Sequence, residues 1–205
     1  MLDLTIIFLL ISLISFTGSL QPGPVNMTVF KNTLNHGFRN GFITALGGSL
    51  PELLYSFLAL WFSSLIFSFG YNELTVSIVV GSILILIGSY YLFKQHVTKS
   101  NTTKKGPPFL TGLSMGMLNP LLFTFWLTIS TWMYSMKLMD SANLNHKLVF
   151  VSGTFFGAFV FLVIVAWLAS KAVELKFLKN TKSIDLLIGS ILILMGLWLI
   201  GKSLI

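Results

Sequence analysis

The apolar run over residues 4–30 is long enough to cross a bilayer as one helix, but two prolines and a glycine interrupt it. Proline lacks a backbone N–H, and its ring clashes with the carbonyl four residues back, so a regular helix cannot continue through it. In hydrocarbon, each freed backbone group costs several kcal/mol unless protein or trapped water satisfies it. The interruption therefore predicts a backbone that faces a protein interior or a wet cavity. Its residues are Gln21, Pro22, Gly23, Pro24, Val25 and Asn26.

Composition places the chain in the membrane. Of its 205 residues, 55% are hydrophobic and 9% are charged, whereas soluble domains carry roughly 25% charged residues. Residues 1–3 lack the positive charge of a signal peptide, so we expect the first span to be retained. Cysteine is absent, which excludes disulfides and thiolate chemistry. No pair of histidines or carboxylates has the spacing of a metal site, and we expect no cofactor and no metal.

Six spans are predicted, in two halves joined by a basic linker. The fold class is an all-α membrane protein built from two inverted three-helix repeats, with helices 1 and 4 broken by proline. The first repeat covers residues 1–94, the cytoplasmic linker 95–108 and the second repeat 109–205. The spans cover residues 4–30, 42–69, 74–93, 109–136, 148–172 and 184–204.

The positive charges set the orientation. Ten of the 13 Lys and Arg residues lie in the first, third and fifth loops, which the positive-inside rule assigns to the cytoplasm. Both termini are then predicted on the non-cytoplasmic side. The net charge of +7 follows from this topology, and no nucleic-acid partner is expected.

An eight-residue motif relates the two halves. Residues 81–88 recur as residues 189–196 with seven positions identical. The two copies lie in the third span of each half, which favours duplication over chance similarity of apolar segments. Three is an odd number of spans, so the halves would have opposite orientations, as in many secondary transporters.

The fourth span is interrupted like the first. Asn119 and Pro120 lie near its middle, so each half begins with a span that contains proline and asparagine. Paired interruptions of this kind indicate a transporter site; the alternative is a pair of ordinary proline kinks. We expect Gln21, Asn26 and Asn119 to contact a solute, together with Pro22, Gly23, Pro24 and Pro120 around them. The helix that restarts after Pro24 would direct free N–H groups at a substrate carboxylate.

Glu52 is the only acidic residue deep inside a predicted span. A charge at the bilayer centre costs about 2.5–3.5 kcal/mol on insertion scales, and desolvation favours the neutral acid. A carboxyl that binds and releases a proton suits proton-coupled transport, or it could pair with a substrate ammonium. The alternative is a permanently protonated, hydrogen-bonded structural residue.

Other signals have simpler interpretations. Gly112, Ser114 and Gly116 match a serine-nucleophile pattern, but all three histidines are expected in loops, so we expect no enzyme. We interpret these glycines, with Gly47, Gly48, Gly153 and Gly157, as close helix packing, within or between chains, which leaves a homo-oligomer open. The tryptophans are interpreted first as interfacial or lipid-facing. For Trp126, the alternative is that it lines the solute pathway.

Pro22, Gly23, Pro24 and Asn26, followed by a glycine-rich second span with an acidic residue, resemble the lysine exporter (LysE/RhtB) family of amino-acid efflux transporters. Asn119 and Pro120 match the family's motif in the fourth span. Pro51 and Glu52 stand where the family pattern has Gly and Asp. The resemblance implies export of amino acids or similar small metabolites, driven by proton exchange, across the inner membrane of a bacterium. Two alternatives stay open: a non-transporting membrane scaffold or assembly factor, and a small-solute channel.

Overall fold

The computed structural model describes residues 2–21, 23–68, 106–119 and 121–171, with isolated positions between 78 and 89 and between 190 and 201. In these ranges every regular element is a helix. The predicted spans over 74–93 and 184–204, with the repeated motif inside them, lie outside the continuously described residues. The helices are α1 (Leu4–Gly18), α2 (Pro24–His36), α3 (Phe38–Ser68), α5 (Pro108–Met117), α6 (Leu121–Ser135) and α7 (Leu144–Ser170).

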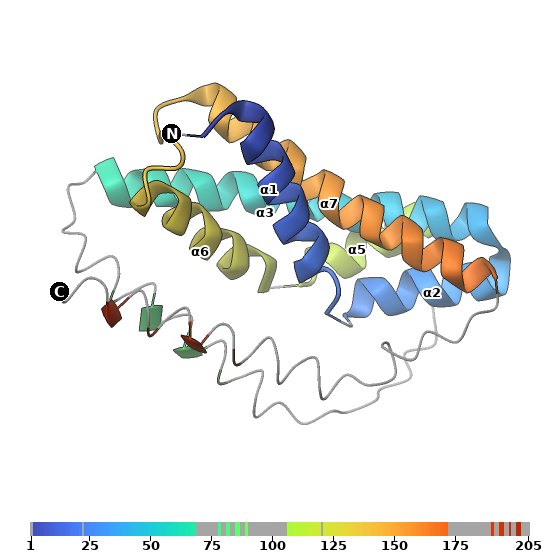
Figure 1. The fold of residues 1–205 in the computed structure, drawn as a ribbon. Coiled ribbons are helices and arrows are strands. Elements are labelled where there is room, and N and C mark those ends of the chain that lie inside the picture. The colour runs from blue at the N-terminus through green and yellow to red at the C-terminus, as the bar shows by residue number, and fades with distance from the viewer. Residues whose placement is uncertain are drawn as a thin grey trace.

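The long helix α3 organises the others, because α2, α5, α6 and α7 all pack on it. Its 31 residues cover about 46 Å at about 1.5 Å per residue, more than the roughly 30 Å hydrocarbon core of a bilayer. In Figure 1, α3 and α7 run the length of the molecule, with α6 toward one end and α2 toward the other. The predicted spans over 42–69 and 148–172 coincide with α3 and α7, which each begin four residues earlier.

Length and composition allow two described helical segments, Phe38–Leu65 and Leu144–Ser170, to cross a membrane. The pair α5 and α6 would form a third span, bent by 62°. The 15 residues of α1 are apolar but too few to cross alone. These two or three candidate spans agree with a membrane protein; six spans and the inverted repeat stay predictions.

Helix directions follow from the contacts. α7 is antiparallel to α3, since Gly41 lies against Ala166 while Ser56 bonds to Thr154. α2 is also antiparallel to α3, since Val25 packs on Gly48 near the start of α2 and Thr33 packs on Gly41 near its end. Three other pairs run in the same direction: α1 with α7, α5 with α3, and α6 with α3.

Two of these parallel pairs depend on glycine. A Cβ on Gly157 would lie 2.1 Å from the carbonyl oxygen of Ser12 in α1, and one on Gly112 would lie 2.1 Å from that of Thr44 in α3. Real Cβ atoms do not approach so closely, so only glycine allows these backbones to touch. The predicted close packing through Gly112 and Gly157 is confirmed, and Gly47, Gly48, Gly116 and Gly153 make similar close contacts.

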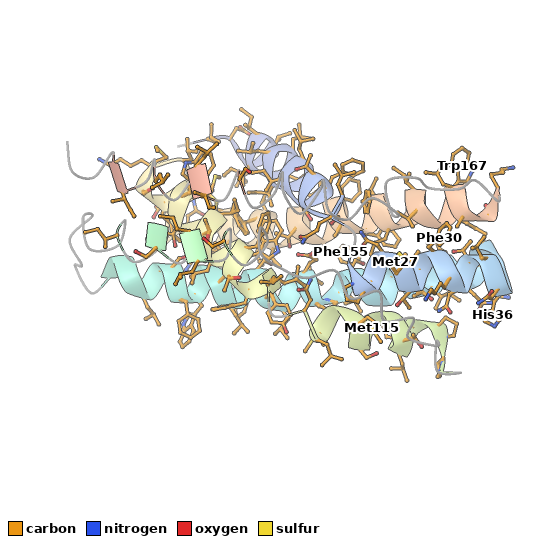
Figure 2. The ribbon with its side chains drawn as sticks, turned by 90° about the horizontal axis from the view of Figure 1, so that it is seen from below. Met27, Phe30, His36, Met115, Phe155 and Trp167 are labelled. Atoms are coloured by element: carbon orange, nitrogen blue, oxygen red, sulfur yellow. The ribbon has the colours of Figure 1, made fainter. Side chains whose placement is uncertain are left out.

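The described basic residues divide between the two ends as the loop count predicts. His36 at the end of α2 and Trp167 near the end of α7 lie at one end of the molecule (Figure 2). Arg39 and Lys171 belong to this end, because α3 begins and α7 ends there. Lys137 lies at the other end, in the segment that joins α6 to α7. Which end faces the cytoplasm stays a prediction.

The buried apolar residues form two clusters with Glu52 between them along α3. The first, cluster A, includes Ala59 and is centred on α1, α6 and α7; the second, cluster B, includes Ala45 and joins α2 to α7. Glu52 lies seven residues from Ala45 and seven from Ala59, about two turns from each. Cluster A contains Ile7, Ile11, Ala59, Leu60, Trp126, Ile129, Met133, Tyr134, Met139 and Phe150. Cluster B contains Val29, Ala45, Phe161, Leu162, Val165 and Ala166.

Candidate functional site

Glu52 is buried at the middle of α3, where its side chain is 8% exposed. The indole Nε1–H of Trp126, on α6, donates a hydrogen bond to its Oε2. Trp126 is itself 1% exposed and packs edge to face on Phe125 and Phe150. The carboxyl therefore lies against an aromatic wall, with one oxygen bound to a neutral donor.

Hydroxyl groups join three helices beside the carboxyl. Ser56, one turn after Glu52, has its Oγ 3.0 Å from Oγ1 of Thr154 on α7. Ser15 of α1 donates to the backbone carbonyl of Thr154 at 2.5 Å. All three side chains are 2% exposed or less. A buried polar group is costly unless it is bonded, so these contacts fix α1, α3 and α7 around the acid.

The first interruption separates α1 from α2. α1 ends at Gly18, and α2 begins at Pro24 with Gly23 as its N-terminal cap. The side-chain amide of Asn26, 5% exposed, donates to the carbonyls of Ser19 and Gln21, both at 2.8 Å. Both hydrogens of this amide therefore stabilise backbone carbonyls at the interruption.

The second interruption lies between α5 and α6. Asn119 Oδ1 accepts a hydrogen bond from the N–H of Leu121 at 3.2 Å and so caps α6. The hydroxyl of Tyr55, on α3, donates to the carbonyl of Met117 at 2.7 Å. Pro22 and Pro120 lie outside the described residues, so their part in the two interruptions stays a prediction.

Both interruptions lie against the same part of α3. A Cβ on Gly48 would lie 2.5 Å from the side chain of Val25, which belongs to the first interruption. Tyr55 binds Met117, which precedes the second. Glu52 lies four residues after Gly48 and three before Tyr55, so one helical turn separates it from each contact.

The structure thus brings the predicted acid to both predicted interruptions. Gln21, Gly23, Pro24 and Asn26 lie at the start of α2, and Asn119 follows α5; α2 and α5 each pack on α3 and also contact each other. α2 has no side-chain cap at its N-terminus, whereas α6 is capped by Asn119. The backbone N–H groups expected to face a carboxylate therefore belong to α2.

Sequence reasoning missed most partners of Glu52. The first interpretation of Trp126, as an interfacial or lipid-facing residue, is wrong because this residue is buried; Trp61 and Trp167, each 52% exposed, fit it. Two sequence features could have identified Ser56 and Thr154. Both are hydroxyl residues inside apolar spans, and Ser56 lies four residues after Glu52, on the same face of the helix. Nothing in the sequence pairs Trp126 with an acid 74 residues away.

The expectation that all histidines lie in loops is also wrong. His146 lies in the first turn of α7, is 6% exposed, and accepts the Asp140 N–H at its Nδ1. His36 is the last residue of α2, and His96 lies outside the described residues. Ser114 donates its hydroxyl to the carbonyl of Thr111, one turn back on its own helix.

Comparison with known proteins gives one match. The family model described as LysE type translocator covers residues 16–203. The matched range includes both interruptions, Glu52 and Trp126. No curated protein and no solved structure matches the chain.

Proposed function

The chain belongs to the LysE type translocator family, and from this we propose that it exports an amino acid or a similar small zwitterion in exchange for protons. Members of this family are membrane transporters of amino acids or related solutes. The finer assignments, namely the coupling ion, the direction and the site, belong to the proposal. We place the protein in the inner membrane of a bacterium, with both termini on the non-cytoplasmic side.

One observation carries the site. Glu52 is a buried acid one helical turn along α3 from Gly48 and Tyr55, which contact residues at the two helix interruptions. Its carboxylate suits a substrate ammonium or a proton, and the uncapped start of α2, which packs on Gly48, suits a substrate carboxylate. The two ends of a zwitterion would thus bind on adjacent turns of the structure. A proton and an ammonium would compete for the same oxygen, and this competition would couple their movements.

The helix directions support two inverted halves. α3 and α7 are antiparallel, and α1 packs parallel to α7 as α5 packs parallel to α3. α1 and α5 therefore run in opposite directions. Exchanging α1 with α5 and α3 with α7 turns the α1–α7 pair into the α5–α3 pair. A pseudo-two-fold arrangement of this kind would allow the two halves to expose the site alternately.

The experiment is exchange in proteoliposomes that contain the full chain. Internal labelled amino acids should leave faster when an imposed pH gradient supplies external protons. Glu52→Gln should make efflux insensitive to that gradient, while the exposed acid variant Asp3→Asn should behave as wild type. Equal pH-driven efflux from Glu52→Gln and wild type would exclude the coupling role. A scaffold would move no solute, and a channel would conduct without accumulating solute against its gradient.

A further inference from the structure

The helix α6 is held against α3 by two sets of polar contacts of different character. Trp126 bonds to Glu52, whose charge can change. About one turn further along α6, Ser130 Oγ lies 2.6 Å and Thr131 Oγ1 3.0 Å from Ser63 Oγ. The hydroxyl contacts are neutral in every state of the protein. Of the two, only the bond to Glu52 can respond to a proton.

α6 begins at a bend in the chain. α5 is fixed to α3 by backbone contact at Gly112 and Gly116, but α6 leaves α5 at 62°. Only Leu118, Asn119 and residue 120 lie between the two helices. Trp126 follows the first residue of α6 by five positions, so it lies near this junction and on the face that meets α3.

Protonation of Glu52 would weaken the bond from Trp126. Hydrogen bonds to an ionised acceptor are roughly twice as strong as those between neutral groups. In a buried site the difference is larger than in water, because little solvent competes. When Glu52 binds a proton, the indole loses its charged acceptor and α6 loses the stronger of its two attachments.

The neighbours of Glu52 add no competing charge. Among the described residues, the side chain that bonds to the Glu52 carboxyl is the neutral indole of Trp126. α7 and α1 contribute Thr154 and Ser15, and α3 contributes Ser56, all neutral hydroxyls. Tyr55, on α3, is the nearby titratable side chain, and its hydroxyl is bound to the carbonyl of Met117.

We propose that Trp126 is the positioning residue through which the protonation of Glu52 controls the docking of α6 on α3. With Glu52 ionised, Trp126 holds α6 in the arrangement seen here, in which the residues of cluster A are packed together. With Glu52 protonated, α6 turns relative to α5, and the packing of cluster A loosens. This proposal rests on the proposed function only in treating Glu52 as the proton site.

The test measures the position of α6 directly. The chain has no cysteine, so nitroxide labels can be placed at Phe57→Cys on α3 and Ser135→Cys at the end of α6. In nanodiscs, the distance between the labels should differ between acidic and alkaline buffer. Trp126→Phe should lose more than half of this shift, and Glu52→Gln should hold one distance at both pH values.

A matched control separates this role from simple packing. Ser63→Ala removes the neutral attachment of α6 and should keep the full pH-dependent shift. A full shift in Trp126→Phe, or no shift in the wild type, overturns the proposal. Labelled protein that shows the shift but moves no solute would reject the proposed function and leave the role of Trp126 standing.

A second measurement leaves Trp126 in place, in case Trp126→Phe does not fold. Replacing Trp61, Trp132, Trp167 and Trp198 with phenylalanine leaves Trp126 as the only indole of the chain. Its fluorescence should change with pH, and Glu52→Gln should abolish the change. Emission that titrates in the same way in Glu52→Gln overturns the link between the two residues.

Discussion

The indole N–H of Trp126 and the carboxyl of Glu52 meet in a hydrogen bond that joins two helices 74 residues apart in sequence. The bond lies at the edge of cluster A, to which Trp126 belongs. The buried acid and cluster A are therefore in direct contact. The contact depends on two properties of the Glu52 side chain, its charge and its length, and each can be changed separately.

The charge of Glu52 can be removed while the length of the side chain is kept. Glu52→Gln keeps a carbonyl oxygen that can accept the bond from Trp126, so the variant should fold normally. It cannot exchange a proton, and pH-driven efflux should fall by at least about tenfold, or ~1.4 kcal/mol. Thermal unfolding and efflux measured on one preparation check both parts. A loss of folding instead of coupling would show a structural role for the acid.

The side chain at position 52 can be shortened while its charge is kept. Glu52→Asp withdraws the carboxylate by one methylene, and Trp126 would then be left with a buried, unbonded N–H. An unsatisfied buried donor costs about 1–3 kcal/mol, so we expect a lower Tm than in Glu52→Gln. Differential scanning fluorimetry in detergent measures the order of the two variants. The reverse order would show that the bond from Trp126 contributes little.

The two asparagines should respond differently to the same change. Asn26→Asp replaces an amide that donates to Ser19 and Gln21 with oxygens that repel both carbonyls. Asn119→Asp keeps the acceptor that caps α6 at Leu121. We expect Asn26→Asp to lower the stability by about 1–3 kcal/mol and Asn119→Asp to leave it near wild type. Equal effects would contradict the two assigned roles.

Close packing of α1 on α7 can be tested at one glycine. Gly157→Ala would place a Cβ 2.1 Å from the carbonyl oxygen of Ser12, and such overpacking costs about 1–3 kcal/mol. Gly23→Ala is the matched control, because the nearest atom to its Cβ would be 3.9 Å away and its φ is −118°. Thermal unfolding should separate the two alanines, and equal melting would contradict the close contact.

Cysteine labelling tests the predicted orientation. Lys137→Cys, in the exposed segment between α6 and α7, should react with an impermeant maleimide added to intact cells. Asn101→Cys, in the basic linker, should react only after the membrane is permeabilised. Labelling of Asn101→Cys from outside would reverse the orientation.

The sequence predicted the elements of this site better than their contacts. Helix α3, helix α7 and the two interruptions follow from apolar length and from proline chemistry, both of which are local properties. Glu52 was identified because an acid is rare within a span. Trp126 was interpreted first as interfacial or lipid-facing, because a tryptophan in an apolar segment has the same local pattern in the core as at the membrane surface. Its burial depends on how α6 packs, and that is a property of the whole fold.

The contacts of the two asparagines could not be predicted from local sequence either. An amide beside a proline in a membrane span predicts either a ligand contact or a repair of the broken backbone. The sequence does not separate these, because both need the same donors at the same depth. The structure assigns the amide hydrogens of Asn26 to the carbonyls of Ser19 and Gln21. The cap at Asn119 is likewise visible only once the direction of α6 is known.

The bonding of Asn26 has a consequence for how such a protein can evolve. Its amide hydrogens bind carbonyls of the interruption itself, so they hold the backbone there without a bound solute. Side chains on α3, α6 and α7 can then change with the solute that is transported while the interruption stays intact. A lineage built on this plan could acquire new solutes by a few substitutions around Glu52 without having to solve the folding problem again.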